Sequence, residues 1–303
     1  ENKQSNHMES RRKIIVILGP TSAGKSAVAI RLAKKFDGEV VSVDSRQIYR
    51  GMDIGTGKVT KEETEGIPHW MLDIVSPRTN FSAAQFKKKA DKAIADILKR
   101  GKLPILCGGT GFWIKSIVDN VTYPEVKPDW ELRKKLEQKE IAELIHELQK
   151  LDPRRAKNID AKNKVRLIRA IEICQTIGQV PEEISDPQYQ ALQIGVSVPK
   201  TKLHAKIKKR LDDRWRDGML AEVERLHQEG LSYKKIQSFG LGYFWIPEYL
   251  NGRITLEELY EKVYLAEKDY AKRQMTWFAK DKRILWLEKY QDMEKEVREF
   301  IKK

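Results

Sequence analysis

Cysteine and long apolar runs are both scarce in this chain of 303 residues. Its two cysteines, Cys107 and Cys174, are too few for a disulfide framework or a four-cysteine zinc site. Both stand in apolar stretches, so we expect buried free thiols in a reducing cytoplasm. No apolar run approaches the roughly 20 residues that a membrane-spanning helix needs, and no signal-peptide pattern is recognisable. We therefore expect a cytoplasmic protein that does not enter membranes, with the leader ENKQSNH before Met8 disordered and outside the fold.

Acidic residues are outnumbered by basic ones. The chain has 58 Lys and Arg against 44 Asp and Glu, a formal net charge of +14, and its sequence pI is about 9.5. A basic surplus favours a polyanionic partner such as nucleic acid, although many basic proteins bind none. Charge by itself therefore suggests a nucleic-acid partner without establishing one.

Apolar runs and amphipathic segments alternate in the first part of the chain. The runs read as buried strands at 13–18, 39–44, 69–75, 103–109 and 191–198. Helical patterning lies between them at 25–36 and 82–100. Such alternation predicts an α/β fold with a doubly wound parallel sheet flanked by helices.

The pattern changes after the Tyr123-Pro124 pair. Strand patterns vanish, and densely charged helical segments replace them, including one at 164–178. Further helices are expected at 201–217, 219–229, 255–280 and 291–302. We expect an α/β core in two parts, 1–123 and a mostly helical 189–303, with an all-helical insertion at 124–188.

The stretch GPTSAGKS (19–26) fits the phosphate-binding pattern G-x-x-x-x-G-K-[ST]. Its backbone N–H groups can line an anion-sized hollow, and the helix that begins there adds a positive dipole end. Lys25 supplies a positive charge, and the hydroxyl of Ser26 suits Mg²⁺. The flanking strand and helix argue against a chance match, so we expect a bound phosphate or diphosphate.

The rest of the sequence offers little machinery for nucleotide hydrolysis. Asp44, at a strand end, could hold Mg²⁺ through water as in NTPases, but a polar and aromatic stretch follows it at 45–51. The strand at 103–109 leads into Gly-Gly-Thr-Gly instead of an acidic residue, and we interpret these small residues as room for a ligand. No base-reading N-K-x-D motif is present. The sequence thus provides a grip for a diphosphate without an apparatus to cleave one from a nucleotide.

Eight motifs occur in the order found in tRNA dimethylallyltransferases, the IPP transferase family, which the chain resembles from about residue 13 to residue 286. They are GPTSAGKS (19–26), VDSRQIYRGMDIGTGK (43–58), IPHWMLDI (67–74), FSAAQF (81–86), GGTGFWIKSI (108–117), LDPRRAKNIDAKNKVRLIRAIEI (151–173), RLDDRWRDGMLAEVERL (210–226) and DYAKRQMTWF (269–278). The resemblance implies transfer of a dimethylallyl group from dimethylallyl diphosphate to the exocyclic N6 amine of the adenosine 3′-adjacent to the tRNA anticodon. It also implies Mg²⁺ as cofactor and, since no zinc-finger extension follows, a bacterial-type enzyme.

The resemblance also assigns roles to single residues. Asp44 is the expected general base, Thr110 contacts the reacting region, and Arg210 binds the diphosphate. Ser45 and Gln47 would hold an adenine flipped out of the anticodon loop. The donor's diphosphate is expected to lie on Gly19, Thr21, Ser22, Ala23, Gly24, Lys25 and Ser26. Contacts with tRNA are expected from Asp44, Ser45, Arg46, Gln47, Thr110, Arg166 and Arg169.

From the residues alone, these assignments keep alternatives. Arg210 stands in a run of charge, which usually marks a solvated face. Arg166 and Arg169, three apart on one helix, could grip phosphates or simply face solvent. The chain also departs from the common family pattern in places: Arg46 and Arg214 replace Met, Val165 replaces Gln, and Glu267 replaces Thr.

Three other functions compete with tRNA prenylation. A P-loop small-molecule kinase would turn over ATP, but it leaves the Asp-Ser-Arg-Gln and Gly-Gly-Thr stretches without a role. A nucleic-acid-binding ATPase would need a hydrolysis apparatus. A prenyltransferase acting on free adenine nucleotides would share the cradle but would not need the helical insertion. We expect a tRNA-modifying enzyme that acts as a monomer.

Overall fold

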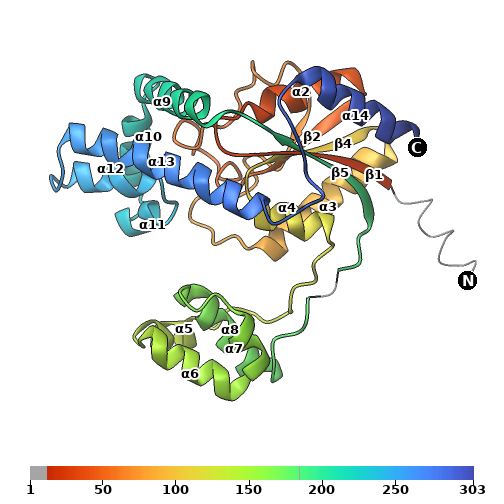
Figure 1. Cartoon of the computed structure of the whole chain (residues 1–303). Coiled ribbons are helices and arrows are strands. Elements are labelled where there is room, and N and C mark those ends of the chain that lie inside the picture. Colours follow the sequence, from red (N-terminus) through yellow and green to blue (C-terminus); the bar gives the residue numbers. More distant parts are fainter. Residues whose placement is uncertain (1–11, 184) are drawn as a thin grey trace, which may run out of the picture. The chain divides into compact units, whose positions relative to one another are not determined.

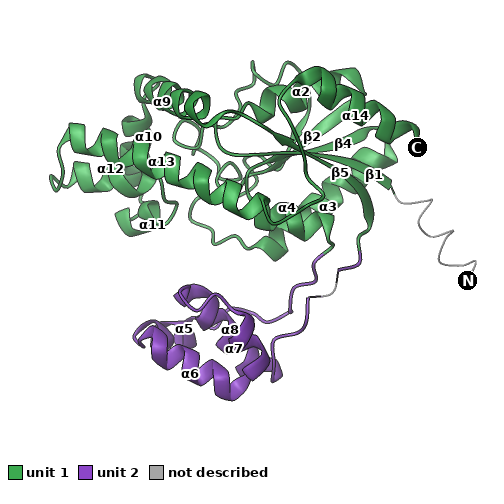
Figure 2. Ribbon diagram, in the orientation of Figure 1, with its two compact units in different colours: residues 1–120, 187–303 green, residues 121–186 purple. Residues whose placement is uncertain are grey.

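The computed structural model describes residues 12–183 and 185–303, and the predicted leader before Met8 lies outside them. The chain divides into two compact units, coloured separately in Figure 2. Unit 1 contains residues 1–120 and 187–303, and unit 2 contains residues 121–186. Unit 2 thus interrupts unit 1 in sequence, close to the insertion expected at 124–188.

Within the described residues of unit 1, six strands form one sheet in the order β3-β2-β4-β1-β5-β6, and every pairing is parallel. The strands are β1 (Arg12–Leu18), β2 (Gly38–Val43), β3 (His69–Trp70), β4 (Leu103–Gly108), β5 (Tyr189–Val196) and β6 (Leu285–Leu287). This confirms the predicted α/β class with a parallel sheet.

Both faces of the sheet are covered by helices (Figure 1). The helices of this unit are α2 (Lys25–Lys35), α3 (Ala83–Lys99), α4 (Gly111–Val118), α9 (Lys200–Arg216), α10 (Met219–Gln228), α11 (Tyr233–Gln237), α12 (Gly242–Leu250), α13 (Leu256–Phe278) and α14 (Tyr290–Lys302). Successive strand residues point to opposite faces, so Ile15 and Ile17 pack with α2 and α14, whereas Ile14 and Val16 pack with α3, α4 and α13. The sequence shows near-continuous apolar runs in β1 and β4 because both faces are buried.

Unit 2 is an all-helical unit with its own core. Its helices are α5 (Trp130–Glu137), α6 (Ile141–Leu151), α7 (Pro153–Asn158) and α8 (Lys164–Ile177). Leu144, Leu148, Leu167 and Ile171 are fully buried within it. Across its described residues, no strand is assigned, as the loss of strand patterning predicts.

Two parts of the sequence-based prediction need correction. The strand predicted at 69–75 ends at Trp70, because Met71 and Asp73 adopt φ of +68° and +53°, which breaks an extended backbone. Val75 forms an isolated parallel bridge with Tyr49, outside the strands of the sheet. The short strand β6 was not predicted, because three residues are too few to show a period.

Among the described residues, no helix is both long and apolar enough to cross a membrane.

Candidate active site

The sequence-predicted site residues of unit 1 gather at the carboxyl ends of three adjacent strands. The phosphate-binding loop follows β1, Asp44 follows β2, and Thr110 lies two residues after β4. Because β4 pairs with both β1 and β2 in parallel, these three strand ends meet at one edge. That edge is where ligands bind in open α/β sheets.

The cradle loop has the backbone that an anion site requires. Gly24 caps α2 in the left-handed conformation, with φ of +95°, and the first turn of α2 contains no acidic residue. The N–H groups of that turn and the positive dipole end therefore remain available to an anion. Ser22 has φ of +60°, and its buried hydroxyl has no hydrogen-bond partner among the described residues. A diphosphate oxygen would satisfy such a hydroxyl.

Lys25 is electrostatically poised within this cradle. Its ammonium donates a hydrogen bond to the carbonyl of Pro20, at 2.6 Å between Nζ and O. The pKa of Lys25 is lowered to about 8, mainly by burial and also by the charge of Arg210, against the opposing effects of Cys107 and Asp44. Burial destabilises the charged form of Lys25 because it removes the ammonium from water. The negative charge of a bound diphosphate would stabilise that charged form again.

Asp44, Ser45 and Thr110 form a connected group. Asp44 Oδ1 accepts the backbone N–H of Arg46 at 2.9 Å, so the carboxylate is held by its own loop. Thr110 Oγ1 accepts the backbone N–H of Ser45 at 3.1 Å. Tyr270 on α13 interacts with both Arg46 and Thr110; burial, and then the charge of Asp44, raises the pKa of its phenol, which therefore stays protonated at neutral pH.

Arg210 leaves the charged run of α9 and reaches the cradle. Its Nη1 donates to Thr21 Oγ1 at 3.1 Å, and its Nη2 donates to the carbonyl of Gly57 at 2.7 Å. Burial is the main cause of the lowered pKa of Arg210, followed by the charge of Arg214. The structure thus places Arg210 beside the loop predicted to bind diphosphate instead of on a solvated face.

Gln47 and Arg46, which were predicted to contact the tRNA, have different hydrogen-bond partners. Gln47 donates through Nε2 to the Gly57 carbonyl at 3.3 Å and accepts from Ser42 Oγ at 3.4 Å. Arg46 donates from Nε to the carbonyl of Phe239 at 2.6 Å, and its guanidinium lies 5.0 Å from the ring centre of Tyr270. Arg46 is therefore fixed by this chain's own groups at the rim of the site.

Gln274 on α13 joins the cradle to the glycine-rich loop, and sequence reasoning gave it no role. Its Oε1 accepts the backbone N–H of Thr21 at 2.8 Å, and its Nε2 donates to the carbonyl of Gly109 at 3.0 Å. A Cβ on Gly109 would stand 2.0 Å from Gln274 Nε2, and one on Gly111 would stand 2.1 Å from the Trp277 ring. The space that a side chain at Gly109 or Gly111 would need is therefore occupied by side chains of α13, and ligand approach to this loop stays a prediction. The quoted DYAKRQMTWF motif contains Gln274, but nothing in its spacing points to two loops more than 150 residues away.

Two departures from the common family pattern contact each other. Arg214 on α9 and Glu267 on α13 form a buried ion pair, with the two residues 6% and 1% exposed. Arg214 also donates to the carbonyl of Gly55 at 2.9 Å. The two residues are 53 positions apart in the sequence, and only the structure shows that they form a pair.

Arg166 and Arg169 lie in unit 2 and have different surroundings. Arg166 has an exposed side chain whose nearest carboxylate, Asp160, lies at 3.8 Å. Arg169 instead bonds to the buried carboxylate of Glu172 and donates to the carbonyl of Val126 at 2.9 Å. Arg166 is thus available to a partner, whereas the guanidinium of Arg169 also holds its own unit together. Their contacts with tRNA stay predictions.

The two cysteines have the environments that the sequence predicts. Both are free and buried. Cys107 lies on β4 below the cradle and contacts the hydroxyl of Ser26, and burial raises its pKa to about 11, so its thiol stays protonated. Within the described part of the chain, no cluster of three or more His, Cys, Asp or Glu side chains is arranged to hold a metal ion.

Comparison with known proteins gives a consistent result. A sequence model of the IPP transferase family matches residues 47–281. The tRNA dimethylallyltransferase of Acetivibrio thermocellus is 43% identical over 286 residues, which cover 91% of each chain. Among solved structures, the full-length tRNA isopentenylpyrophosphate transferase of Bacillus halodurans has a TM-score of 0.72 and 35% identity, with 96% of each chain covered. A eukaryotic dimethylallyltransferase acting on tRNA has a TM-score of 0.81 and 28% identity, over 91% of this chain and 74% of that one.

The family model covers residues 47–281, which begin after the cradle and Asp44, whereas the two bacterial relatives are matched over 91% and 96% of the chain. The relatives confirm the resemblance drawn from the eight sequence motifs. The chain therefore belongs to the IPP transferase family.

Proposed function

We propose that the chain transfers a dimethylallyl group from dimethylallyl diphosphate to the exocyclic N6 amine of the tRNA adenosine 3′-adjacent to the anticodon, giving N6-isopentenyladenosine. The observation that carries this proposal is the meeting of the phosphate cradle, Arg210 and Asp44 at one sheet edge. The names of the relatives supply the class of reaction.

The donor side of the site is built to bind and release a diphosphate. The unpartnered hydroxyl of Ser22 and the charge of Lys25 belong to the cradle loop, and Arg210 bonds to Thr21 of the same loop. As the bond between C1 of the dimethylallyl group and its diphosphate oxygen breaks, negative charge accumulates on the leaving group. Preorganised donors that stabilise such developing charge usually make the largest contribution to catalysis.

On the acceptor side, Asp44 is the proton acceptor. The N6 amine forms its new bond to C1 while the C1–O bond breaks and the diphosphate departs. The proton that N6 loses passes to the carboxylate of Asp44, which the N–H of Arg46 holds in place. Thr110, tied to the backbone of Ser45, keeps the two loops in register at the reacting region.

Magnesium fits this donor set. Mg²⁺ commonly binds through one or two protein groups and substrate phosphates, with waters completing its shell. Ser26 offers a hydroxyl at the start of α2, next to the cradle. When bound, the ion would neutralise charge on the diphosphate, and the residue proposed to hold it is Ser26.

We further propose that tRNA contacts unit 2, that the enzyme acts as a monomer, and that it works in the cytoplasm. All proposed catalytic groups come from unit 1 of a single chain. The free buried thiols suit a reducing compartment.

The test is a paired assay with the full chain and Mg²⁺. Unmodified tRNA is incubated with dimethylallyl diphosphate, and its digested nucleosides are analysed by mass spectrometry; a parallel tube receives ATP. The expected result is a prenyl mass on adenosine in the anticodon loop, with ATP unchanged. Steady ADP formation without a prenyl mass would replace this proposal by a P-loop kinase. Prenylation of free AMP but not of tRNA would indicate an enzyme acting on adenine nucleotides.

A further inference from the structure

The loop of residues 53–58 lies between the two halves of the site. The carbonyl of Gly57 accepts hydrogen bonds from Arg210 Nη2 at 2.7 Å and from Gln47 Nε2 at 3.3 Å. The first side chain is proposed to bind the diphosphate and the second to bind the adenine. The position of one backbone carbonyl therefore influences both.

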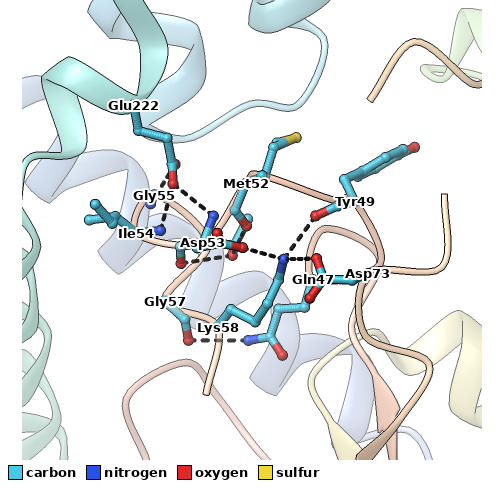
Figure 3. A network of polar contacts seen from close by, with 12 residues as sticks. Gln47, Tyr49, Met52, Asp53, Ile54, Gly55, Gly57, Lys58, Asp73 and Glu222 are labelled. Carbon is cyan, nitrogen blue, oxygen red and sulfur yellow. Dashed lines mark hydrogen bonds and ion pairs between the residues drawn. The ribbon is translucent and has the colours of Figure 1, made fainter. Parts of the chain in front are cut away.

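A buried carboxylate from α10 holds this loop (Figure 3). Glu222 Oε2 accepts the N–H groups of Asp53 and Ile54 at 2.7 and 2.8 Å, and its Oε1 accepts the N–H of Gly55 at 2.9 Å. The hydroxyl of Tyr243 donates to the same Oε1 at 2.6 Å. Three successive amides aimed at one point form the kind of concavity that binds anions, and here a side chain 167 or more residues away fills it.

Hydrogen bonds within the loop connect the residues that Glu222 holds to Gly57. The N–H of Gly57 donates to the carbonyl of Ile54, and the N–H of Lys58 donates to the carbonyl of Asp53, each at 2.9 Å. The turn that carries the Gly57 carbonyl is therefore closed on the residues whose amides Glu222 holds. A shift of those amides moves the carbonyl with them.

The loop is also held by bonds that do not involve its amides of residues 53–55. Lys58 Nζ bonds to the carbonyl of Tyr49 at 2.8 Å and to the carboxylates of Asp53 and Asp73, each at 2.5 Å (Figure 3). These bonds tie the end of the loop to its neighbours. Arg214 donates to the carbonyl of Gly55 at 2.9 Å. Glu222 alone, among the residues described, accepts from three consecutive amides of the loop, so it restrains the direction in which these amides point.

We propose that Glu222 is a positioning residue for the transfer reaction. By holding the amides of residues 53–55 it fixes the Gly57 carbonyl, and through that carbonyl it orients Arg210 toward the diphosphate and Gln47 toward the adenine. The names of the two ligands rest on the proposed function, but the link from Glu222 to Arg210 is testable with inorganic pyrophosphate alone.

The decisive variant is Glu222→Gln in the full chain. It replaces one carboxylate oxygen by an NH₂ group, which then faces N–H or O–H donors instead of accepting from them. Calorimetric titration with inorganic pyrophosphate and Mg²⁺ should show a Kd raised about tenfold, the lower end of the effect of removing a group that orients a ligand-binding side chain. In an Arg210→Ala background the same change should alter Kd less than about twofold, because the group through which Glu222 acts is missing.

Glu39→Gln is the matched control. Glu39 is 2% exposed, is the second residue of β2, at the end away from the site, and accepts hydrogen bonds from Arg100 and Trp70 at 2.8 Å. The variant should lower the melting temperature and leave the pyrophosphate Kd unchanged. If it weakens pyrophosphate as much as Glu222→Gln does, or if Glu222→Gln acts equally with and without Arg210, the inference is wrong.

A second variant covers the case that Glu222→Gln does not fold. Glu222→Asp keeps the charge but withdraws it by one methylene, and it should give a smaller rise in Kd that again disappears with Arg210→Ala. The proposed link from Glu222 to Gln47 is tested separately, through KM for tRNA. Glu222→Gln should raise this KM, and it should not raise it further when Gln47→Ala is present. Absence of transfer by the unmodified chain would refute the proposed function; normal transfer with an unchanged Kd in either Glu222 variant would refute only this inference.

Discussion

The side-chain amide of Gln274 accepts the backbone N–H of Thr21 at 2.8 Å, although the two residues are 253 positions apart. Its other end donates to the carbonyl of Gly109 at 3.0 Å. One buried amide group therefore sets the separation of the phosphate cradle from the loop that carries Thr110. Both loops follow neighbouring strands, but strand pairing alone does not fix what lies beyond the strand ends.

Gln274→Glu should disturb this separation. The carboxylate can still accept from Thr21 but faces the carbonyl oxygen of Gly109, so an acceptor meets an acceptor. We expect KM for dimethylallyl diphosphate to rise by about tenfold or more, as for other residues that orient ligand-binding groups. Gln193→Glu is the control: Gln193 is 3% exposed on β5 and contacts Asp281. It should lower the melting temperature while KM stays the same, and equal KM values for both variants would contradict the role of Gln274.

Asp44→Asn separates the charge of the general base from its position. Asparagine retains an oxygen that can accept the N–H of Arg46, so the loop should stay in place. Loss of the proton acceptor should lower kcat by about 10² to 10⁴, and Asp44→Ala should abolish turnover. Binding of tRNA, measured by filter retention or fluorescence, should be nearly unchanged in both. A large loss of tRNA affinity with turnover preserved would overturn the assignment of Asp44 as base.

Binding of pyrophosphate should weaken at alkaline pH because of Lys25. The pKa of this residue in the unliganded protein is about 8, so its ammonium is charged below that pH and neutral above it. An anion favours the charged form, and affinity should therefore be retained below pH 8 and fall by up to about tenfold per pH unit above it. Lys25→Arg remains charged across this range. Subtracting its calorimetric profile removes the titration of pyrophosphate itself, and identical profiles for the two proteins would refute the prediction.

Arg214 and Glu267 should behave as one unit in stability measurements. Arg214→Met or Glu267→Thr alone leaves an uncompensated buried charge and should lower the free energy of unfolding by about 3–5 kcal/mol. The double variant carries the residues common in the family and should lose much less than the sum of the two. Urea denaturation of all four proteins gives this coupling. Additive losses would show that the pair does not act together.

Arg166 and Arg169 should respond differently to removal. Arg166→Ala removes an exposed cation and should weaken tRNA binding, reducing the slope of log affinity against log salt by about 1. Arg169→Ala removes a partner of the buried Glu172 and should mainly destabilise unit 2, as read by its melting transition. If tRNA affinity moves in neither variant, unit 2 is not the tRNA-binding element proposed for it.

Local patterns in the sequence were sufficient for much of this fold. Apolar runs of six to eight residues predicted β1, β2, β4 and β5, and the helical period predicted α2, α3, α8 and α13, with ends within a few residues of those observed. The strand predicted at 69–75 was too long, because the pattern of apolar residues cannot reveal the positive φ of Met71 and Asp73. The three-residue strand β6 depends on its neighbour β5 and has no signal of its own.

Part of the site could likewise be predicted from the sequence, and part could not. The sequence by itself determined the phosphate cradle, since its glycines, lysine and serine act through a backbone shape that eight consecutive residues create. Motif order then pointed to Asp44, Thr110 and Arg210. Only the tertiary structure decided that Arg210 reaches Thr21, that Gln274 joins two loops, that Arg214 pairs with Glu267 and that Glu222 holds the amides of residues 53–55. These are contacts between side chains and backbone groups far apart in the chain, and hydrogen bonds of this kind exist only once packing brings their partners within about 3 Å of each other.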